Sequence, residues 1–420
     1  MEVGTVPRAL VIQLARLGDL VQSLPAIAAL RARHPETQLD LLCPSQLAEV
    51  GRMLPGIENV LEWDGAAWRR RAEAAGHDLR PDHLVDVEAA LAALAPERYD
   101  CAYVLNQHPR ALVAASLLAY DVTGPLEHGP LDRTLTPWAA YVRDVARRAT
   151  GQRVHLADAF CGLCGCSPPG RVVTLDPPDV RLPDDLDRIG KQGAPWIALI
   201  VGAGETERLV PAAIWRQWIV AFLASAPRGR VVLVGTERER AAEIQAPLPP
   251  SVLGRIWDAT GRTSLTQLAA MLARCHRIIG ADTGPLHLAA ALGRPVIGWY
   301  FARARVHETG PYGIHHVVWQ AEDVKRDASC VMREASCVKR EANEHLSAAS
   351  RFTHHASPVR WPVDETIAAV LSRTAEASDG WTVWQSHCDR FGAYYTEAGR
   401  PPDPPCEREA LWRELEPAHS

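Results

Sequence analysis

The sequence predicts an α/β protein with two domains, each built on a doubly wound, parallel β-sheet. Short apolar runs typical of buried strands alternate with helical stretches along the chain, which is the pattern of parallel sheets. The chain has 420 residues, which exceeds the size of a single hydrophobic core. A stretch rich in Pro, Asp and Gly at 170–194 separates two sets of strands. We therefore expect α/β domains over residues 1–180 and 195–375.

The first strand–helix–strand unit lies at the start of the chain. The run LVIQL is a predicted strand, the polar turn ARLGD follows it, and an amphipathic helix leads to the next strand, TQLDLLC. Ligands in open parallel sheets bind at the carboxyl ends of strands. The turn places Asp19 at such an end, where it is either a functional carboxylate or a simple helix cap.

A second unit of the same kind spans residues 280–301. The strand CHRIIG precedes a tight turn, Asp282-Thr283-Gly284, and Pro285 stands where the first turn of a helix begins. Such a turn offers free backbone N–H groups and the positive end of a helix dipole, which suits a phosphate group. Taken alone, the turn fits an ordinary helix cap equally well.

The remaining elements follow the same alternation of strand and helix. Predicted strands include 99–106, 196–204 and the runs RVVLVG and PVIGWYF, and predicted helices lie at 111–120, 212–226, 237–245, 264–275 and 364–374. A polar insertion is expected at about 321–360. Residues 376–420 form a C-terminal extension whose aromatic side chains predict packing on the body of the protein, and the sequence indicates no role for it.

Composition excludes several function classes. A net charge of −5 argues against a nucleic-acid-binding protein. No apolar run reaches the length of a membrane span, and the N-terminus lacks the pattern of a signal peptide. We expect a cytoplasmic monomer, at most peripheral to the inner membrane. Basic residues of the N-terminal half face either an anionic acceptor, membrane headgroups or solvent: Arg8, Arg16, Arg31, Arg33, His34, Arg52, Arg69, Arg70 and Arg71.

The cysteines do not predict a metal site. Cys161, Cys164 and Cys166 lie in a helical pattern with no second ligand pair of suitable spacing, so burial in the core is the better interpretation. For Cys330 and Cys337 a metal or a disulfide stays open, although thiols in the cytosol are usually reduced.

Together these segments resemble the family 9 glycosyltransferases, the lipopolysaccharide heptosyltransferase family. That family carries an LGD turn after its first strand and a DTGxxH turn late in the chain, which stand here at residues 17–19 and 282–287. The segments DATGRTSL and VGAGETERLVPAAIWRQW also resemble family landmarks. The resemblance covers roughly residues 8–375. It implies the GT-B arrangement, in which two Rossmann-like domains face a cleft.

The resemblance also implies a reaction. It is the transfer of a sugar, heptose from ADP-heptose, onto a lipopolysaccharide core or related glycan acceptor, with inversion and without metal or other cofactor. The acceptor hydroxyl needs a base, and Asp19 matches the family's catalytic Asp. The leaving diphosphate needs stabilisation, which helix amides and a cation supply.

The donor-binding residues that the resemblance implies lie in the C-terminal half. Arg208 stands where the family usually carries Lys, and Thr283 and Gly284 would offer N–H groups to the phosphates. Asp282 faces the sugar or orders the turn. His287 reaches a phosphate or the sugar, or is a satisfied histidine between helix and sheet.

Two weaker assignments complete the donor site. Glu237 matches the position that holds the ribose hydroxyls, and Thr263 matches the position where relatives approach the base.

The acceptor side departs most from the family. Arg16 and Arg110 are the implied acceptor-binding residues. Gln13 stands where many relatives have Arg, and His108 and Pro109 are unusual. The acceptor therefore need not be the inner-core Kdo or heptose.

Two other functions are alternatives to glycosyl transfer. A non-catalytic nucleotide-sugar-binding relative would fit the departures at Gln13 and Arg208, but retention of Asp19 argues against it. An NAD-dependent oxidoreductase is disfavoured because VGAGETE has glutamate where the dinucleotide fingerprint needs its third glycine.

Overall fold

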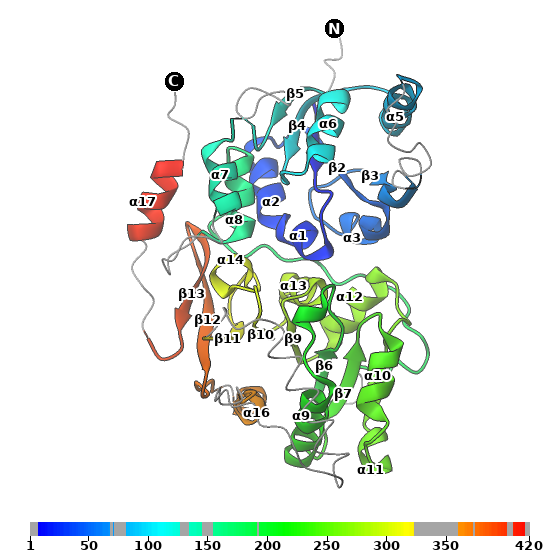
Figure 1. Cartoon of the computed structure of the whole chain (residues 1–420), viewed down its shortest axis with the longest axis vertical. Coiled ribbons are helices and arrows are strands. Elements are labelled where there is room, and N and C mark those ends of the chain that lie inside the picture. The colour runs from blue at the N-terminus through cyan, green and yellow to red at the C-terminus, as the bar shows by residue number, and fades with distance from the viewer. Residues whose placement is uncertain are drawn as a thin grey trace, which may run out of the picture.

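The protein contains two β-sheets with helices packed around them, one parallel and one parallel except for its last two strands, largely as the sequence predicted (Figure 1). The computed structural model describes residues 7–67, 70, 81–126, 134–144, 154–190, 193–322, 360–372, 374–400 and 406–415. Most of the predicted polar insertion, with Cys330 and Cys337, lies outside these residues. The prediction of two Rossmann-like domains is confirmed.

The first sheet has five parallel strands in the order β3-β2-β1-β4-β5. The strands are β1 (Arg8–Ile12), β2 (Gln38–Pro44), β3 (Val60–Trp63), β4 (Tyr99–Val104) and β5 (Ala119–Thr123). The helices around it are α1 (Leu17–Gln22), α2 (Leu24–Arg33), α3 (Ala48–Gly51), α5 (Pro81–Leu94), α6 (Pro109–Leu118), α7 (Pro137–Asp144) and α8 (Leu156–Leu163). The central strand β1 is almost fully buried, as expected for a strand covered on both faces.

The second sheet has eight strands in the order β13-β12-β11-β10-β9-β6-β7-β8. The parallel strands are β6 (Trp196–Ile200), β7 (Arg230–Val234), β8 (Ile256–Asp258), β9 (Arg277–Ala281), β10 (Val296–Tyr300) and β11 (Val317–Ala321). The helices are α9 (Ala212–Ser225), α10 (Arg238–Gln245), α11 (Pro250–Leu253), α12 (Leu265–Arg274), α13 (Gly284–Ala291), α14 (Val306–Thr309) and α16 (Val363–Ser372), with a 3-10 turn at Thr206–Arg208.

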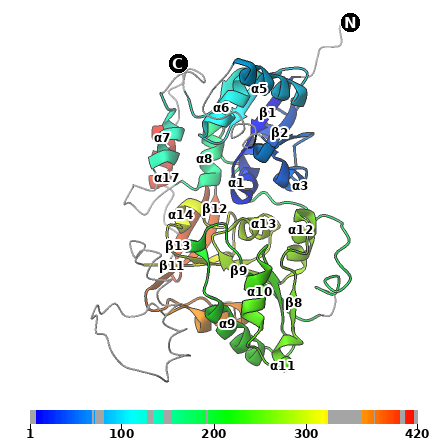
Figure 2. The same ribbon diagram turned by 45° about the vertical axis from the view of Figure 1, so that its right-hand side comes forward.

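Strand order gives each domain one candidate position for a ligand. The direction of winding reverses between β1 and β4 in the first sheet, and between β6 and β9 in the second. Ligands of doubly wound sheets bind at the carboxyl ends of strands at such reversals. The helix that follows β1 is α1 and the helix that follows β9 is α13, and these two helices meet between the domains (Figures 1 and 2).

The helix predicted after the LGD turn is divided into two helices in the structure. The sequence predicted a continuous helix after the LGD turn, but α1 ends at Gln22 and α2 starts at Leu24. Pro25 lacks an N–H group and cannot continue the bonding pattern of α1, so Ser23 separates the two helices. Asp19 lies at the third position of α1, and the N-cap is Arg16. Asp19 is therefore not the N-cap residue, but its side chain caps the helix from the third position by accepting the Arg16 N–H, so a capping role stays open beside the catalytic one.

The C-terminal extension completes the second sheet and reaches the first domain. Strands β12 (Trp381–Asp389) and β13 (Gly392–Glu397) continue the sheet beyond β11 in antiparallel pairing. Helix α17 (Cys406–Leu415) then lies beside α7 (Figure 1), where Trp412 packs on Trp138 with ring centroids 4.3 Å apart. The extension thus contacts both domains, and its aromatic side chains pack as predicted.

A buried carboxyl joins three segments at this contact. Asp158 of α8 accepts a hydrogen bond from the Tyr312 hydroxyl (2.8 Å) and another from the Ala393 N–H of β13 (2.9 Å). A side chain at position 392 would collide with this carboxyl, so Gly392 is required there. Burial raises the pKa of Asp158 from 3.8 to about 8, and the two hydrogen bonds only partly oppose this effect.

None of the helices in the described part of the chain has the length and apolar character needed to cross a bilayer.

The raised pKa of Asp158 predicts how stability depends on pH. The folded protein holds this proton up to about pH 8, whereas the unfolded chain releases it near 3.8. The stabilising contribution is complete below the unfolded pKa and is lost as pH rises through the folded pKa. Asp158→Asn mimics the protonated carboxyl, so thermal unfolding should show a smaller decrease in melting temperature between about pH 5 and pH 8 than in the wild type.

Asp184→Asn is the control, because Asp184 is an exposed carboxylate on the segment that links the domains. It should keep the pH dependence of the wild type. Equal slopes for Asp158→Asn and the wild type would show that Asp158 is ionised in the folded protein.

Candidate active site

The first wall of the candidate site is the start of α1. Arg16 has an extended backbone and α1 begins at Leu17, so the Asp19 carboxylate turns back and accepts the Arg16 N–H (3.2 Å). The completely buried Gln13 follows β1 and accepts a hydrogen bond from Asn106, which follows β4 (3.1 Å). This bond joins the two strand ends that flank the crevice of the first domain.

Asp19 has the electrostatic environment of a base. Burial raises its pKa, and the negative charge of Asp282 adds to this effect. The Arg16 N–H bond and the nearby His287 and Arg16 oppose it without cancelling it. A carboxylate with a raised pKa takes up a proton more readily than an ordinary one, which is what an attacking hydroxyl needs from a base.

The second wall is the turn after β9, organised around Asp282. This carboxylate is 6 % exposed. Oδ1 accepts hydrogen bonds from His287 Nε2 (3.0 Å) and the Tyr300 hydroxyl (3.3 Å). Oδ2 accepts bonds from Arg208 Nη1 (3.0 Å) and the Thr309 hydroxyl (3.3 Å).

These four bonds decide the ionisation and the role of Asp282. Burial would raise its pKa, but the hydrogen bond from His287 and the charges of His287 and Arg208 outweigh burial and lower it. Asp282 is therefore a fixed anion. Because each of its oxygens already has two partners, the geometry favours ordering of the turn over direct contact with a sugar.

The N-terminus of α13 forms the floor of the turn. Thr283 is the N-cap with an extended backbone, and its hydroxyl donates to the Ala281 carbonyl and does not cap the helix. The first amides of a helix have no partner within the helix, and Pro285 removes one of them. The N–H groups of Thr283 and Gly284 are therefore the candidates for binding an anion at this helix N-terminus.

The two walls are in contact because each helix presents a glycine to the other: Gly18 lies at the start of α1 and Gly284 at the start of α13. A Cβ on Gly18 would lie 3.0 Å from His287 Cδ2, and one on Gly284 would lie 2.8 Å from Leu17 Cβ. Arg16 also forms an ion pair with Glu205, which lies in the loop after β6 (2.7 Å). The structure therefore brings Asp19 and Arg16 together with Arg208, Asp282, Thr283, Gly284 and His287.

Three predicted site residues lie further from this contact. Glu237 is the N-cap of α10 after β7, and its carboxylate lies so close to Gly202 that a Cβ there would be 1.9 Å from Oε2. Thr263 directly precedes Ser264, the N-cap of α12. Arg110 is exposed in the first turn of α6, after β4, and donates to His108 Nδ1 (3.2 Å). All three follow the carboxyl ends of strands.

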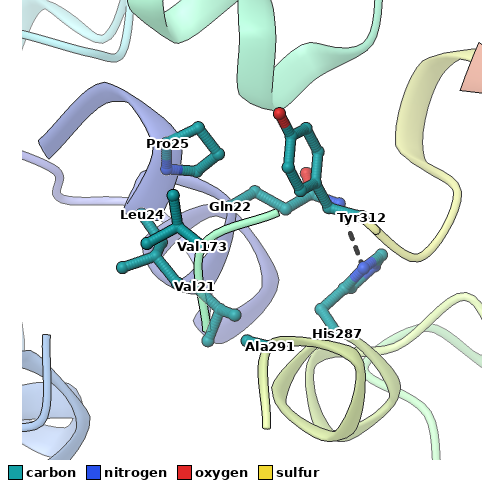
Figure 3. Close-up of a pocket in the computed structure, with 8 residues that line it drawn as sticks. All are labelled: Val21, Gln22, Leu24, Pro25, Val173, His287, Ala291 and Tyr312. Atoms are coloured by element: carbon teal, nitrogen blue, oxygen red, sulfur yellow. Dashed lines mark hydrogen bonds between the residues drawn. The ribbon is translucent and has the colours of Figure 1, made fainter. Parts of the chain in front are cut away.

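Three residues of the site were not predicted from the sequence. Tyr300 and Thr309 bind Asp282, and Gln22 of α1 contacts His287 across the domain boundary, with Nε2 3.0 Å from Nδ1. A polar residue on the buried side of an apolar helix was the available signal for Gln22. Figure 3 shows it extending from α1 toward His287, beside a cavity of about 10 Å³, which holds about one water molecule.

The cysteines at 161, 164 and 166 lie in the core and not in this site. Cys161 and Cys164 are buried in the core beside α8, and Cys166 is nearly so. Among the described residues, no group of three or more His, Cys, Asp or Glu side chains is arranged to hold a metal ion.

Comparison with known proteins identifies the family. The sequence profile of glycosyltransferase family 9 (heptosyltransferase) matches residues 93–336, more than half of the chain. The chain belongs to glycosyltransferase family 9. The resemblance inferred from the two turns is therefore confirmed, and with it the assignment to the heptosyltransferase family of transferases.

Individual relatives agree with this assignment. Lipopolysaccharide heptosyltransferase 1 of Pseudomonas aeruginosa is 26% identical over 323 residues, covering 73% of this chain and 81% of the relative. Lipopolysaccharide heptosyltransferase 2 of Escherichia coli is 26% identical over 324 residues, covering 69% and 82%. The chain thus spans most of the length of these relatives.

Solved structures share the fold. The E. coli heptosyltransferase WaaC with ADP has a TM-score of 0.56 at 20% identity, covering 81% of this chain and 100% of that one. The family 9 protein of Veillonella parvula has a TM-score of 0.56 at 19% identity, covering 82% and 91%.

The geometry of the turn predicts how nucleotide binding responds to mutation. If the Asp282 turn holds a diphosphate, Arg208→Ala removes a charge-assisted contact worth about 1.5–3 kcal/mol. The affinity for ADP, measured by calorimetry, should decrease by roughly 10- to 100-fold. Binding of ADP should also raise the melting temperature of the wild type more than that of the variant.

Arg228→Ala is the matched control. Arg228 is an exposed residue just before β7, at the amino end of that strand, whereas the candidate site lies at the carboxyl ends of the strands. It should bind ADP like the wild type. An unchanged affinity in folded Arg208→Ala would place the diphosphate elsewhere.

Proposed function

We propose that the protein is an inverting, metal-independent glycosyltransferase that moves a heptose from ADP-heptose onto a lipopolysaccharide core or related anionic glycan. The observation that supports this most is the contact between the Asp19 turn and the Asp282 turn. A base from one domain and an anion-binding helix N-terminus from the other meet at the two points where doubly wound sheets bind ligands. The names of the heptosyltransferase relatives support transfer of a heptose, and the solved structure of E. coli WaaC with ADP supports an ADP-linked donor.

The proposed reaction is a single displacement. The acceptor hydroxyl attacks the anomeric carbon of the donor, the new C–O bond forms as the bond to the diphosphate breaks, and the hydroxyl proton passes to the Asp19 carboxylate. One displacement by one nucleophile inverts the anomeric configuration. The raised pKa of Asp19 suits this step, because the proton must be accepted near neutral pH.

The leaving diphosphate is stabilised by fixed groups of the second domain. The N–H groups of Thr283 and Gly284 and the guanidinium of Arg208 are the proposed donors to the diphosphate, and Asp282 holds Arg208 beside the turn (Nη1–Oδ2 3.0 Å). These donors replace the charge that a divalent cation would supply. Glu237 and Thr263 hold the nucleoside in this proposal.

The acceptor is proposed only as a class. Arg16 and Arg110 flank the crevice of the first domain and suit an anionic glycolipid or glycan. Gln13 is used in joining β1 and β4, so this crevice lacks the positive charge that arginine would bring there. We further propose that the protein acts as a monomer in the cytoplasm, in peripheral contact with the inner membrane.

Asp19→Asn separates a transferase from a nucleotide-sugar-binding protein. Asparagine keeps the size and most hydrogen bonds of Asp19 but cannot take a proton, and a general base contributes about 10²–10⁴-fold in rate. Turnover of ADP-heptose with a lipid A–core acceptor should decrease at least about a hundredfold, while ADP affinity stays that of the wild type. Asp184→Asn, at an exposed position, should leave both unchanged.

The same assay is run in excess EDTA, and the wild type should keep its activity. Complete loss that Mg²⁺ or Mn²⁺ restores would contradict the metal-independent mechanism. Near-wild-type turnover of Asp19→Asn would place the base elsewhere. A wild type that binds ADP yet transfers to no acceptor would favour the non-catalytic function.

A further inference from the structure

We propose that Glu205 is an internal counter-ion of the candidate site. Before the donor binds, its carboxylate neutralises both Arg208 and Arg16, and the diphosphate of the donor displaces it from Arg208. Glu205 thereby weakens the binding of ADP, the product that must leave after transfer. This inference rests on the proposed function, because it needs a diphosphate at Arg208.

Glu205 stands at the position of a helix cap but does not act as one. It is the N-cap residue of the 3-10 turn at Thr206–Arg208, and its side chain makes no capping hydrogen bond. Each of its oxygens instead faces an arginine: Oε1 lies 2.7 Å from Arg16 Nη1, and Oε2 lies 3.4 Å from Arg208 Nε. One carboxylate of the second domain thus connects the arginine proposed for the acceptor with the arginine proposed for the donor.

The surroundings of Glu205 keep it ionised. The hydrogen bond from Arg16 and then the charge of Arg208 lower the pKa of this carboxyl, and the charge of Arg303 adds to the effect. Burial opposes these effects without cancelling them. A negative charge therefore lies beside two of the cations that the proposed reaction uses.

Arg208 faces two carboxylates, which hold it differently. Asp282 is 6 % exposed, and its Oδ2 accepts a hydrogen bond from Nη1 at 3.0 Å. The 3.4 Å contact of Glu205 is an ion pair only, since Nε is a buried donor for which the described part of the chain provides no hydrogen-bond partner. The Glu205 side chain is 38 % exposed and has solvent to move into. Asp282 is therefore the anchor of Arg208, and Glu205 is the partner that a ligand can replace.

Replacing Glu205 lowers the affinity for any anion bound at Arg208. A diphosphate gains the attraction of the guanidinium but must first overcome that of the carboxylate already beside it. Because both groups are partly exposed, the effect is small, and exposed ion pairs correspond to about two- to fivefold in an equilibrium constant. The same carboxylate also opposes an anionic acceptor at Arg16.

Glu205→Gln tests this role, because it keeps the size of the side chain and removes its charge. The dissociation constant for ADP, measured by calorimetry at low salt, should decrease by about two- to fivefold. This gain should shrink as NaCl is raised from about 50 mM to about 500 mM, because salt screens exposed charges. Loss of a merely structural contact would weaken ADP binding or leave it unchanged, so a tighter complex is specific to a competing charge.

Glu207→Gln is the matched control. Glu207 is an exposed residue of the same turn, and among the ion pairs of the described residues it contacts neither Arg16 nor Arg208. This variant changes the net charge by the same amount as Glu205→Gln. It should bind ADP like the wild type.

The transfer reaction provides a second readout. With ADP-heptose as donor, the inhibition constant of the product ADP should fall in Glu205→Gln by the same factor as the dissociation constant. The KM for an anionic acceptor should also decrease, because Arg16 loses its partner. Glu205→Ala removes the same two contacts and should act in the same direction.

Unchanged or weaker ADP binding by folded Glu205→Gln would overturn the inference, and so would an equal gain in Glu207→Gln. If Glu205→Gln does not fold, Glu205→Ala decides by the same criterion. Arg208→Ala distinguishes the two levels of the account. A loss of affinity in Arg208→Ala without a gain in Glu205→Gln refutes the counter-ion alone, whereas no change in either variant refutes the donor site as well.

Discussion

The contact between the starts of α1 and α13 is the interaction on which the rest of the site depends. It exists because position 18 and position 284 carry no side chain, and either Cβ would come within about 3 Å of the opposite helix. Around it, buried apolar side chains of both domains form one continuous cluster that includes Leu20, Leu286 and Leu288. The contact therefore brings the Asp19 turn of one domain against the Asp282 turn of the other.

The same contact separates the properties of two neighbouring carboxyl groups. Asp19 is partly buried and has few compensating bonds, so its pKa is raised. Asp282 is buried more deeply, but it accepts four hydrogen bonds, among them those from His287 and the cationic Arg208, so its pKa is lowered. Pairs of titratable groups with pKa values shifted in opposite directions indicate distinct roles. In the proposed mechanism Asp19 accepts a proton, and Asp282 holds Arg208 in place.

The fold and the positions of both turns could be predicted from local patterns in the sequence. Strand and helix periodicity, and the LGD and DTG segments, each lie within one short contiguous stretch of the chain. The division at Ser23 was missed, since the apolar pattern continues through Pro25. Gln22, Tyr300 and Thr309 were missed because their partners lie in distant segments, which no local pattern reveals. The pairing of β12 with β11 is likewise a long-range contact, between strands about 60 residues apart.

The central claim is that one sugar nucleotide lies between Asp19 and the Asp282 turn. A crystal structure of the protein with ADP-2-deoxy-2-fluoro-heptose tests this most directly. We expect the diphosphate to contact the N–H groups of Thr283 and Gly284 and the Arg208 guanidinium. The anomeric carbon should face Asp19 across a space that fits one hydroxyl. A nucleotide bound away from α13, or a sugar whose reactive face points away from Asp19, would contradict it.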